Sequence, residues 1–422
     1  MIAAIRPGVA RGTVAAPPSK SMAHRLLICA ALSAGESLVR GVDPSEDILA
    51  TADCLSALGA SLSWEKPAGR ESLLPESGTG ESGPSGSAVL VRGCDPCAAA
   101  PAVLRCRESG STLRFMIPLC LLSGCPMRLE GSETLLSRPL SVYEDLCRAR
   151  GLALSRESGG LRAEGRLAPG DYAVPGNVSS QFITGLLFAL PLLPGDSRIR
   201  LIPPVESRSY LSLTLQALND AGVQVSWQDE YTLLVPGSSV YRAGDRIVEG
   251  DYSNAAFFEA LNCFGSGVSV TGLREDSLQG DRVYRQYFAL LREGPAALDL
   301  TDCPDLAPVL FATAALCRGA VFTGTRRLRF KESDRGAVMA REMAKFGVVL
   351  NLEENRITVP AGILHPPAEP LSSHNDHRVA MALSLLCTRV GGEIHGAEAV
   401  RKSFPDYWEK LRSLGIPLAL SG

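Results

Sequence analysis

The sequence predicts an α/β protein of two domains, each assembled from repeated units of helices and strands. The chain has 422 residues, which is long for one domain and sufficient for two. Apolar residues make up 45% of it and charged residues 21%, as in ordinary globular proteins rather than disordered or fibrous ones. Two short patterns recur along the chain, and interleaving them gives about six units, each with two helices and several strands.

The first pattern is an amphipathic helix, then a glycine, then a strand of alternating apolar and polar residues. The glycine suits the position just after a helix, where the backbone turns left-handed. The alternation that follows is typical of a half-buried strand. Copies are centred on Gly59, Gly151, Gly222, Gly347 and Gly415, and a degenerate copy lies near Gly294.

The second pattern is a loop rich in Ser, Asn, Asp and Gly that opens an apolar helix. Each such helix start exposes backbone N–H groups and the positive end of the helix dipole. If several of them face one cleft, that cleft binds anions without a basic overall sequence. Copies are PPSKSMAHRLLICAAL, ESGSTLRFMIPLCLL, PGNVSSQFITGLLFAL, EGDYSNAAFFEALNCF, CPDLAPVLFATAAL and NDHRVAMALSLLC.

A polar segment at residues 66–87 differs from the rest of the chain. It is rich in Gly, Ser, Pro and Glu and has little to bury, so we expect a mobile surface loop. Strands at residues 59–65 and 88–92 would flank this loop as an extended hairpin.

Charge, hydropathy and cysteine usage exclude several classes of protein. A net charge of -3 gives no global basic field for nucleic acid or an acidic membrane. No uninterrupted apolar stretch approaches the length of a membrane span, and the N-terminus lacks a long apolar signal core. Twelve scattered cysteines indicate reduced thiols, and the lone C-x-x-C at Cys94 and Cys97 lacks the second half of a zinc site. We therefore expect a cytoplasmic protein without a bound metal.

Residues suited to catalysis gather at the predicted helix starts. Serine or aspartate before a helix is an ordinary N-cap, and exposed basic residues usually just solvate a surface. Basic residues at a helix N-terminus oppose the dipole, however, and an anionic ligand would offset that cost. Arginine also presents a planar fork that suits carboxylate or phosphate. The candidates are Lys20, Ser21 and Arg25; Ser179, Ser180 and Gln181; Ser207 and Tyr210; Lys331, Glu332, Asp334 and Arg335; Asp376, His377 and Arg378; and Lys402.

Six motifs make the sequence similar to one family. P-x-S-K-S-x-x-x-R, S-G-S-T-x-R, G-N-V-S-S-Q-F, R-x-K-E-S-D-R, N-D-H-R-x-A-M and K-S-F-P-D-Y follow one another between residues 17 and 408. In these motifs and their order the chain resembles the enolpyruvyl-shikimate-phosphate synthases. The resemblance implies the enolpyruvyl transferase fold, a two-domain inverse α/β barrel built from six βαβαββ-type repeats.

The same resemblance implies where the domains divide. One barrel would take residues 1–14 plus 238–422, and the other would take residues 15–237. The chain would cross between them near residues 13–17 and 236–242, and the active site would lie in the cleft between the two barrels.

The reaction implied is transfer of the enolpyruvyl group of phosphoenolpyruvate to the 5-hydroxyl of shikimate 3-phosphate, in aromatic amino-acid biosynthesis. Phosphoenolpyruvate would be protonated at its methylene, the hydroxyl would attack the carbon beneath, and the tetrahedral intermediate would lose phosphate. Positioning and fixed cations suffice for this chemistry, so no metal or organic cofactor is expected. We expect a monomer that binds these two small molecules, neither nucleic acid nor membrane.

The family's roles carry over by motif. For catalysis the resemblance implies Asp305 as the base for the 5-hydroxyl, with Lys20, Glu332 and His377 moving protons at the vinyl carbon or the leaving phosphate. Shikimate 3-phosphate would contact Lys20, Ser21, Arg25, Ser179, Ser180, Gln181, Ser207, Tyr210, Asp305 and Lys331. Phosphoenolpyruvate would contact Lys20, Gly110, Gln181, Arg335, Arg378 and Lys402.

Three positions depart from the family pattern. Thr134 stands where an arginine is expected, five residues before the proline of the Arg138–Pro139 pair, so one basic ligand is predicted to be missing or supplied from elsewhere. Glu108 and Arg327 stand where asparagines are common. Two alternatives therefore remain at this stage: a non-catalytic binder of the same anions, and a transferase acting on UDP-N-acetylglucosamine. The UDP-N-acetylglucosamine alternative lacks support, because the reactive-cysteine loop typical of those transferases has no counterpart in this sequence.

Overall fold

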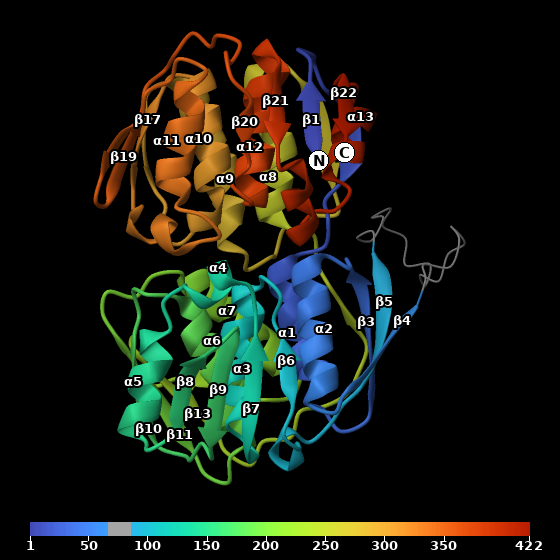
Figure 1. The fold of residues 1–422 in the computed structure, drawn as a ribbon, viewed down its shortest axis with the longest axis vertical. Coiled ribbons are helices and arrows are strands. Elements are labelled where there is room, and N and C mark those ends of the chain that lie inside the picture. Colours follow the sequence, from blue (N-terminus) through green and yellow to red (C-terminus); the bar gives the residue numbers. More distant parts are fainter. Residues whose placement is uncertain (66–85) are drawn as a thin grey trace. The chain divides into compact units, whose positions relative to one another are not determined.

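The computed structural model describes residues 1–65 and 86–422, and its contacts divide the chain into two compact units. Unit 1 comprises Met1–Pro17 and Gly250–Gly422, and unit 2 comprises Pro18–Glu249 (Figure 1). Both boundaries lie further along the chain than the expected junctions at residues 14/15 and 237/238. The segment up to Glu249 stays with unit 2 because β14 (Arg246–Ile247) pairs with β3 (Glu36–Val42). Most of the loop predicted at residues 66–87 lies outside the described residues.

Unit 2 contains three four-stranded sheets with one shared pairing scheme. In each sheet the first pair of strands is parallel and the next two pairs are antiparallel. The sheets are β14–β3–β5–β4, β6–β7–β9–β8 and β10–β11–β13–β12. The strands not yet given are β4 (Ser61–Glu65), β5 (Ser87–Arg92), β6 (Val103–Arg105), β7 (Gly124–Glu130), β8 (Ala153–Glu157), β9 (Gly160–Gly165), β10 (Asp171–Pro175), β11 (Ser197–Ile202), β12 (Ser226–Trp227) and β13 (Thr232–Val235).

Seven α-helices connect the strands of unit 2 in its described part. They are α1 (Lys20–Ala31), α2 (Glu46–Ala57), α3 (Gly110–Cys120), α4 (Glu133–Leu136), α5 (Ser141–Ala149), α6 (Ser180–Ala189) and α7 (Arg208–Asp220).

Unit 1 repeats the scheme with two four-stranded sheets and one two-stranded parallel sheet. The sheets are β20–β21–β1–β22, β16–β17–β19–β18 and β15–β2. The strands are β1 (Ile2–Ile5), β2 (Arg11–Ala15), β15 (Gly267–Thr271), β16 (Ala296–Asp299), β17 (Ala320–Thr323), β18 (Asn351–Glu353), β19 (Arg356–Val359), β20 (Leu371–Ser372), β21 (Gly392–His395) and β22 (Leu418–Ser421). The α-helices are α8 (Tyr252–Ala260), α9 (Tyr284–Glu293), α10 (Ala307–Leu316), α11 (Arg335–Ala344), α12 (His377–Val390) and α13 (Tyr407–Ser413). The six sheets account for the six repeats that the sequence predicts.

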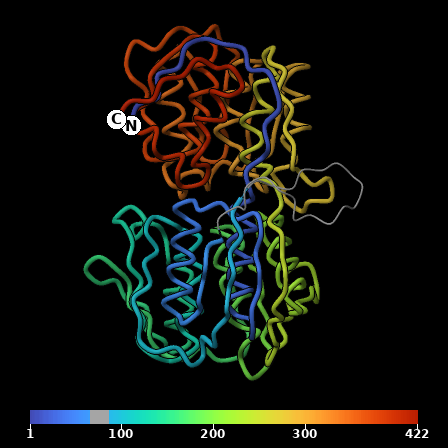
Figure 2. The backbone as a smooth tube through the Cα atoms, turned by 90° about the vertical axis from the view of Figure 1, so that its right-hand side faces the viewer, coloured from blue at the N-terminus to red at the C-terminus, as the bar shows by residue number. Residues whose placement is uncertain are grey.

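The chain ends meet in unit 1. Strand β1 pairs antiparallel with β22, with Ile2 opposite Ser421, so the N-terminal strand completes the sheet of the last repeat. Figure 2 shows the two ends of the tube side by side, blue next to red. This pairing explains why the first residues of the chain belong with its C-terminal half.

The helix–glycine–strand pattern forms as predicted at its five clear copies. The five glycines have φ values of 110°, 66°, 82°, 87° and 92°, in the left-handed region that favours glycine after a helix. A strand follows each of them: β4, β8, β12, β18 and β22. The degenerate copy differs, because Gly294 has φ of -177° and joins α9 to β16 in an extended conformation.

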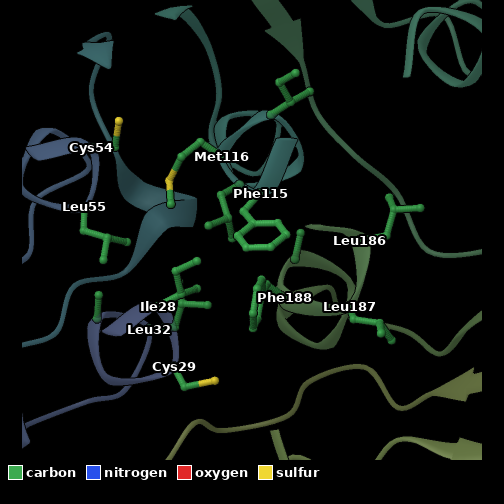
Figure 3. Packing of buried hydrophobic residues seen from close by; sticks show 14 of the residues in the cluster. Ile28, Cys29, Leu32, Cys54, Leu55, Phe115, Met116, Leu186, Leu187 and Phe188 are labelled. Carbon is green, nitrogen blue, oxygen red and sulfur yellow. The ribbon is translucent and has the colours of Figure 1, made fainter. Parts of the chain in front are cut away.

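Apolar helices fill the centre of each unit. In unit 2, α3 and α6 pack against each other, and the rings of Phe115 and Phe188 meet edge to face with centroids 5.7 Å apart (Figure 3). In unit 1, α10 and α12 play the same part, and Val309 and Leu386 are completely buried. Helices inside and sheets outside confirm the predicted inverse arrangement.

The twelve cysteines all carry free thiols, and Cys94 and Cys97 are half-buried. Within residues 1–65 and 86–422, His, Cys, Asp and Glu side chains form no group of three that could hold a metal ion. The helices of this described part include none with the length and apolar character of a membrane span.

Candidate active site

The first group of candidate residues lies in unit 1 around Arg335, the first residue of α11. Its side chain is 1% exposed and donates to three carboxylates. Nε reaches Asp376 at 2.9 Å, Nη1 reaches Asp305 at 2.8 Å and Nη2 reaches Glu332 at 2.6 Å. A buried guanidinium is tolerated only when paired in this way. The acids therefore fix the position of this arginine closely.

Asp305 is the acid that joins this group together. It lies in the short helix η5 (Pro304–Leu306) before α10 and contacts Lys331 Nζ at 3.0 Å, Arg335 Nη1 at 2.8 Å and Arg378 Nη2 at 3.2 Å. Burial alone would raise the pKa of Asp305, but the cations of Arg378, Lys331 and Arg335 together hold that pKa well below its usual value. Asp305 is therefore a carboxylate at neutral pH and can accept a proton.

The start of α12 and the short helix η7 (Ala397–Lys402) contribute the remaining candidates of unit 1. Asp376 caps α12 by accepting the backbone N–H of Arg378 at 2.9 Å. His377 follows the cap and its side chain is 1% exposed. Lys402, itself buried, donates from Nζ to the Asn375 carbonyl at 2.7 Å. Lys402 thus joins the group through the turn that precedes α12.

The second group lies in unit 2 and begins at the start of α1. Ser19 caps this helix, and Lys20 is its first residue. Lys20 Nζ donates to Asp47 Oδ2 at 2.7 Å, with side chains 14% and 11% exposed. In both units, therefore, protein carboxylates offset the basic residues that the sequence places at helix N-termini.

Gly110, the first residue of α3, lies directly beneath two arginines. A methyl group built on Gly110 would lie 2.6 Å from Arg138 Nη1 and 3.5 Å from Arg114 Nη1. Arg114 Nη1 also donates to Gln181 Oε1 at 2.6 Å, and Gln181 Nε2 donates to Ser111 Oγ at 2.9 Å. A side chain at this position would therefore require the guanidinium of Arg138 to move away from Gly110.

Arg25 is committed largely to its own unit. It is 3% exposed, and it donates to the Ser21 carbonyl at 2.6 Å, to the Tyr210 carbonyl at 3.0 Å and to Thr214 Oγ1 at 2.9 Å. Burial lowers the pKa of Arg25 to about 10, which still leaves it protonated at neutral pH. The expected shared face of Ser21 and Arg25 is present, and it places Arg25 against the start of α7.

The serines of this group lie at or just before the starts of helices α6 and α7. Ser179 caps α6, where its Oγ accepts the Gln181 N–H at 3.3 Å, and Ser180 is buried as the first residue of that helix. Ser207 precedes α7 with φ of 59°, an uncommon left-handed conformation for a residue other than glycine. Such strain is found where the fold holds a side chain in a required direction.

The chain is similar along nearly its full length to proteins that share one description. The family model described as EPSP synthase (3-phosphoshikimate 1-carboxyvinyltransferase) matches residues 6–411. The 3-phosphoshikimate 1-carboxyvinyltransferases of Clostridium kluyveri and Clostridium beijerinckii are 37% and 38% identical to it. Each alignment covers 97% of this chain and at least 96% of the relative.

This chain belongs to the EPSP synthase family. A solved EPSP synthase from Acinetobacter baumannii has the same fold, with a TM-score of 0.76, 22% identity and complete coverage of both chains. The family and the fold expected from the motifs are both confirmed. As an EPSP synthase family member the chain is an enzyme of the transferase class.

The sequence interpretation did not include two arginines, Arg138 and Arg114, among the site residues of this EPSP synthase family member. Thr134 is exposed on α4, whereas Arg138 lies against Gly110. Arg138 thus places a cation beside Gly110 that the sequence interpretation did not assign to the site. The expectation that a basic ligand is missing or supplied from elsewhere stays a prediction. Arg114 was also present in the S-G-S-T-x-R motif, four residues after Gly110 and so on the same helix face. That spacing was the available signal.

The other two departures lie close to the groups described above. Glu108 is half-buried two residues before Gly110. Arg327 is buried and donates from Nη2 to the Thr301 carbonyl at 2.7 Å, so it acts within the packing of unit 1.

Proposed function

We propose that this protein transfers the enolpyruvyl group of phosphoenolpyruvate to the 5-hydroxyl of shikimate 3-phosphate and releases phosphate. The observation that carries the proposal is the group formed by Asp305, Lys331, Arg335 and Arg378, a carboxylate held among three cations in a member of this family. The carboxylate suits proton abstraction from a hydroxyl, and the cations suit a substrate that bears both phosphate and carboxylate.

Phosphoenolpyruvate is assigned to the cations. Its proposed ligands in unit 1 are Arg335, Arg378 and Lys402. Its proposed ligands in unit 2 are Lys20, Gly110 and Gln181, as the sequence predicts. We add Arg138 and Arg114, because both guanidinium groups approach Gly110. Arg335, Arg378 and Arg114 are positioned by protein acceptors before a substrate arrives, which reduces the reorganisation needed during the reaction.

Shikimate 3-phosphate is assigned to Ser21, Arg25, Ser179, Ser180, Gln181, Ser207, Tyr210 and Lys20, together with Asp305 and Lys331. Among them, Ser207 has a left-handed backbone, and Ser179 Oγ is held at the start of α6 by the Gln181 N–H. Lys331 lies 3.0 Å from Asp305 and holds the acid that takes the hydroxyl proton.

The reaction proceeds by addition and then elimination. A proton is added to the methylene carbon of phosphoenolpyruvate, the 5-hydroxyl oxygen bonds to the adjacent carbon, and Asp305 takes the hydroxyl proton. The bond from that carbon to the phosphate oxygen then breaks, and loss of a methyl proton restores the double bond. Lys20, Glu332 and His377 are assigned to the remaining proton transfers, and general acid–base groups typically contribute about 10²- to 10⁴-fold to such steps.

Asp305 gains basicity when phosphoenolpyruvate binds. Arg335 and Arg378 depress its pKa, and both are assigned to the incoming substrate anions. As the anions draw these cations away from Asp305, its pKa rises toward the ordinary value. The base is therefore activated by the arrival of phosphoenolpyruvate.

The test is phosphate release from the purified protein given phosphoenolpyruvate and shikimate 3-phosphate, with UDP-N-acetylglucosamine as the parallel acceptor. In the presence of phosphoenolpyruvate, we expect phosphate release with shikimate 3-phosphate as the acceptor and none with UDP-N-acetylglucosamine. Release with UDP-N-acetylglucosamine alone would reassign the acceptor, and a folded protein that releases phosphate with neither acceptor would refute the proposal.

A further inference from the structure

Glu342 is a buried carboxylate to which the proposed reaction gives no role. Its side chain is 1% exposed and accepts hydrogen bonds from Lys345 Nζ at 2.8 Å and the Ser372 N–H at 3.0 Å. His374 Nε2 lies 2.9 Å from its other oxygen. Burial alone would raise the pKa of Glu342, but these donors outweigh it and leave the pKa below its usual value. Glu342 is thus a charged anchor within unit 1.

The partners of Glu342 lie on a turn with unusual backbone geometry. Residues 372–376 connect β20 to α12, and His374 and Asn375 have φ values of 49° and 57°. Two consecutive residues other than glycine in the left-handed region are costly and persist only where surrounding contacts hold them. Glu342 supplies two of those contacts, one through a side chain and one through a backbone N–H.

Helix α11 holds this turn at both of its ends. Arg335 and Glu342 are about two helical turns apart and so lie on the same face of α11. Glu342 contacts Ser372 and His374 at the beginning of the turn, and Arg335 Nε contacts Asp376 at its end, at 2.9 Å. Glu342 therefore helps to set the position of the residues that lead to Asp376, together with the bond from the Ser373 N–H to the His395 carbonyl at 3.0 Å.

The turn also holds a proposed phosphoenolpyruvate ligand. The Asn375 carbonyl accepts the hydrogen bond from Lys402 Nζ at 2.7 Å. Asp376 in turn contacts Arg335 and accepts the N–H of Arg378 at the start of α12. A shift of this turn would move together the Asn375 acceptor of Lys402 and one of the three carboxylates that hold Arg335.

We propose that Glu342 is a positioning residue for phosphoenolpyruvate, acting through His374 and the Ser372 N–H on the turn that orients Lys402 and Arg335. This inference rests on the proposed function. It predicts that disturbing Glu342 weakens phosphoenolpyruvate binding and affects shikimate 3-phosphate much less, because the serines, Tyr210 and Arg25 assigned to that substrate belong to unit 2 and only Asp305 and Lys331 belong to unit 1.

The test compares three variants at this contact with one control. Glu342→Ala removes the anchor, and Glu342→Gln keeps an acceptor oxygen without the charge. His374→Asn shortens the side chain so that it no longer reaches Glu342, and asparagine still tolerates positive φ. Lys345→Ala is the control, because it removes the bonds from Lys345 Nζ to Glu342 and to the Pro370 carbonyl but leaves both contacts of Glu342 with the turn in place.

We expect Glu342→Ala to raise the KM for phosphoenolpyruvate about tenfold, since hydrogen bonds to charged groups are the strong ones. Glu342→Gln and His374→Asn should give smaller rises in the same KM, and Lys345→Ala should stay within about twofold of wild type. The KM for shikimate 3-phosphate, and its calorimetric Kd, should stay within about twofold for all four.

The outcomes separate this inference from the proposed function. If the wild-type protein releases no phosphate from the two substrates, the proposed function fails. If the wild-type protein is active and folded His374→Asn and Glu342→Gln leave the KM for phosphoenolpyruvate unchanged, the positioning role of Glu342 is refuted. An equal rise in both KM values, with a lowered Tm, would also refute it, because that result indicates general destabilisation.

Discussion

Replacing Gly110 by alanine tests the proposed phosphoenolpyruvate ligands most directly. The added methyl group would lie 2.6 Å from Arg138 Nη1, whereas ordinary contact with a carbon begins near 3.4 Å. Arg138 must therefore retreat by roughly 0.8 Å, since a separation this short is strongly repulsive at van der Waals range. Arg114 Nη1, at 3.5 Å, can remain in place.

The cost to substrate binding follows from Coulomb's law. A charge pair at a typical separation of about 2.8 Å, in an effective dielectric of about 20, is worth about 5.9 kcal/mol. At about 3.6 Å the same pair is worth about 4.6 kcal/mol. The difference of about 1.3 kcal/mol corresponds to about a tenfold weaker interaction. Gly110→Ala should therefore raise the KM for phosphoenolpyruvate about tenfold.

The assay is steady-state phosphate release with each substrate varied in turn, together with a thermal melt. Gly244→Ala is the matched control in the same unit, because a methyl group there would meet nothing within 4 Å. Its KM values should equal those of wild type. The reasoning is refuted if folded Gly110→Ala keeps the wild-type KM for phosphoenolpyruvate, or if the KM for shikimate 3-phosphate rises equally.

Three further predictions concern Asp305 and Thr134. Asp305→Asn should retain calorimetric binding of shikimate 3-phosphate and lose about 10²- to 10⁴-fold in kcat; a near-normal kcat would remove Asp305 as the base. Because the pKa of Asp305 is lowered in the folded state, its stabilising contribution is complete above the unfolded value of about 3.9 and is lost as pH falls toward the folded value. The difference between the urea unfolding free energies of wild type and Asp305→Asn should therefore shrink on acidification, and a constant difference would contradict this. Thr134→Arg should leave the KM for phosphoenolpyruvate within about twofold, as for other exposed substitutions; a large fall would show that a basic ligand is missing at residue 134.

The repeats could be predicted from the sequence because their signals are local. A glycine after an amphipathic helix needs only its own left-handed backbone, and Gly59 and Gly347 adopt it with φ of 110° and 87°. Helix starts such as the one at Lys20 are likewise set by capping residues within a few positions. Motif spacing therefore located the repeats, the helix starts and most of the candidate residues.

The ends of the repeats were less predictable, because long-range pairing decides them. Strand β14 joins unit 2 through β3, and this moves the boundary to Glu249. Strand β1 completes the sheet of the last repeat by pairing with β22. Neither two-residue β14 nor four-residue β1 carries a periodicity that reveals its partner.

The sequence by itself determined the family, the repeat architecture and the residues able to bind anions, because those depend on residue type and spacing along the chain. Only the tertiary structure decided which charges meet. It placed Arg138 rather than residue 134 over Gly110, gathered three cations on Asp305, and joined Glu342 to the turn before α12. These contacts join residues from different elements, and their strength depends on separation and burial in the folded chain rather than on position in the sequence.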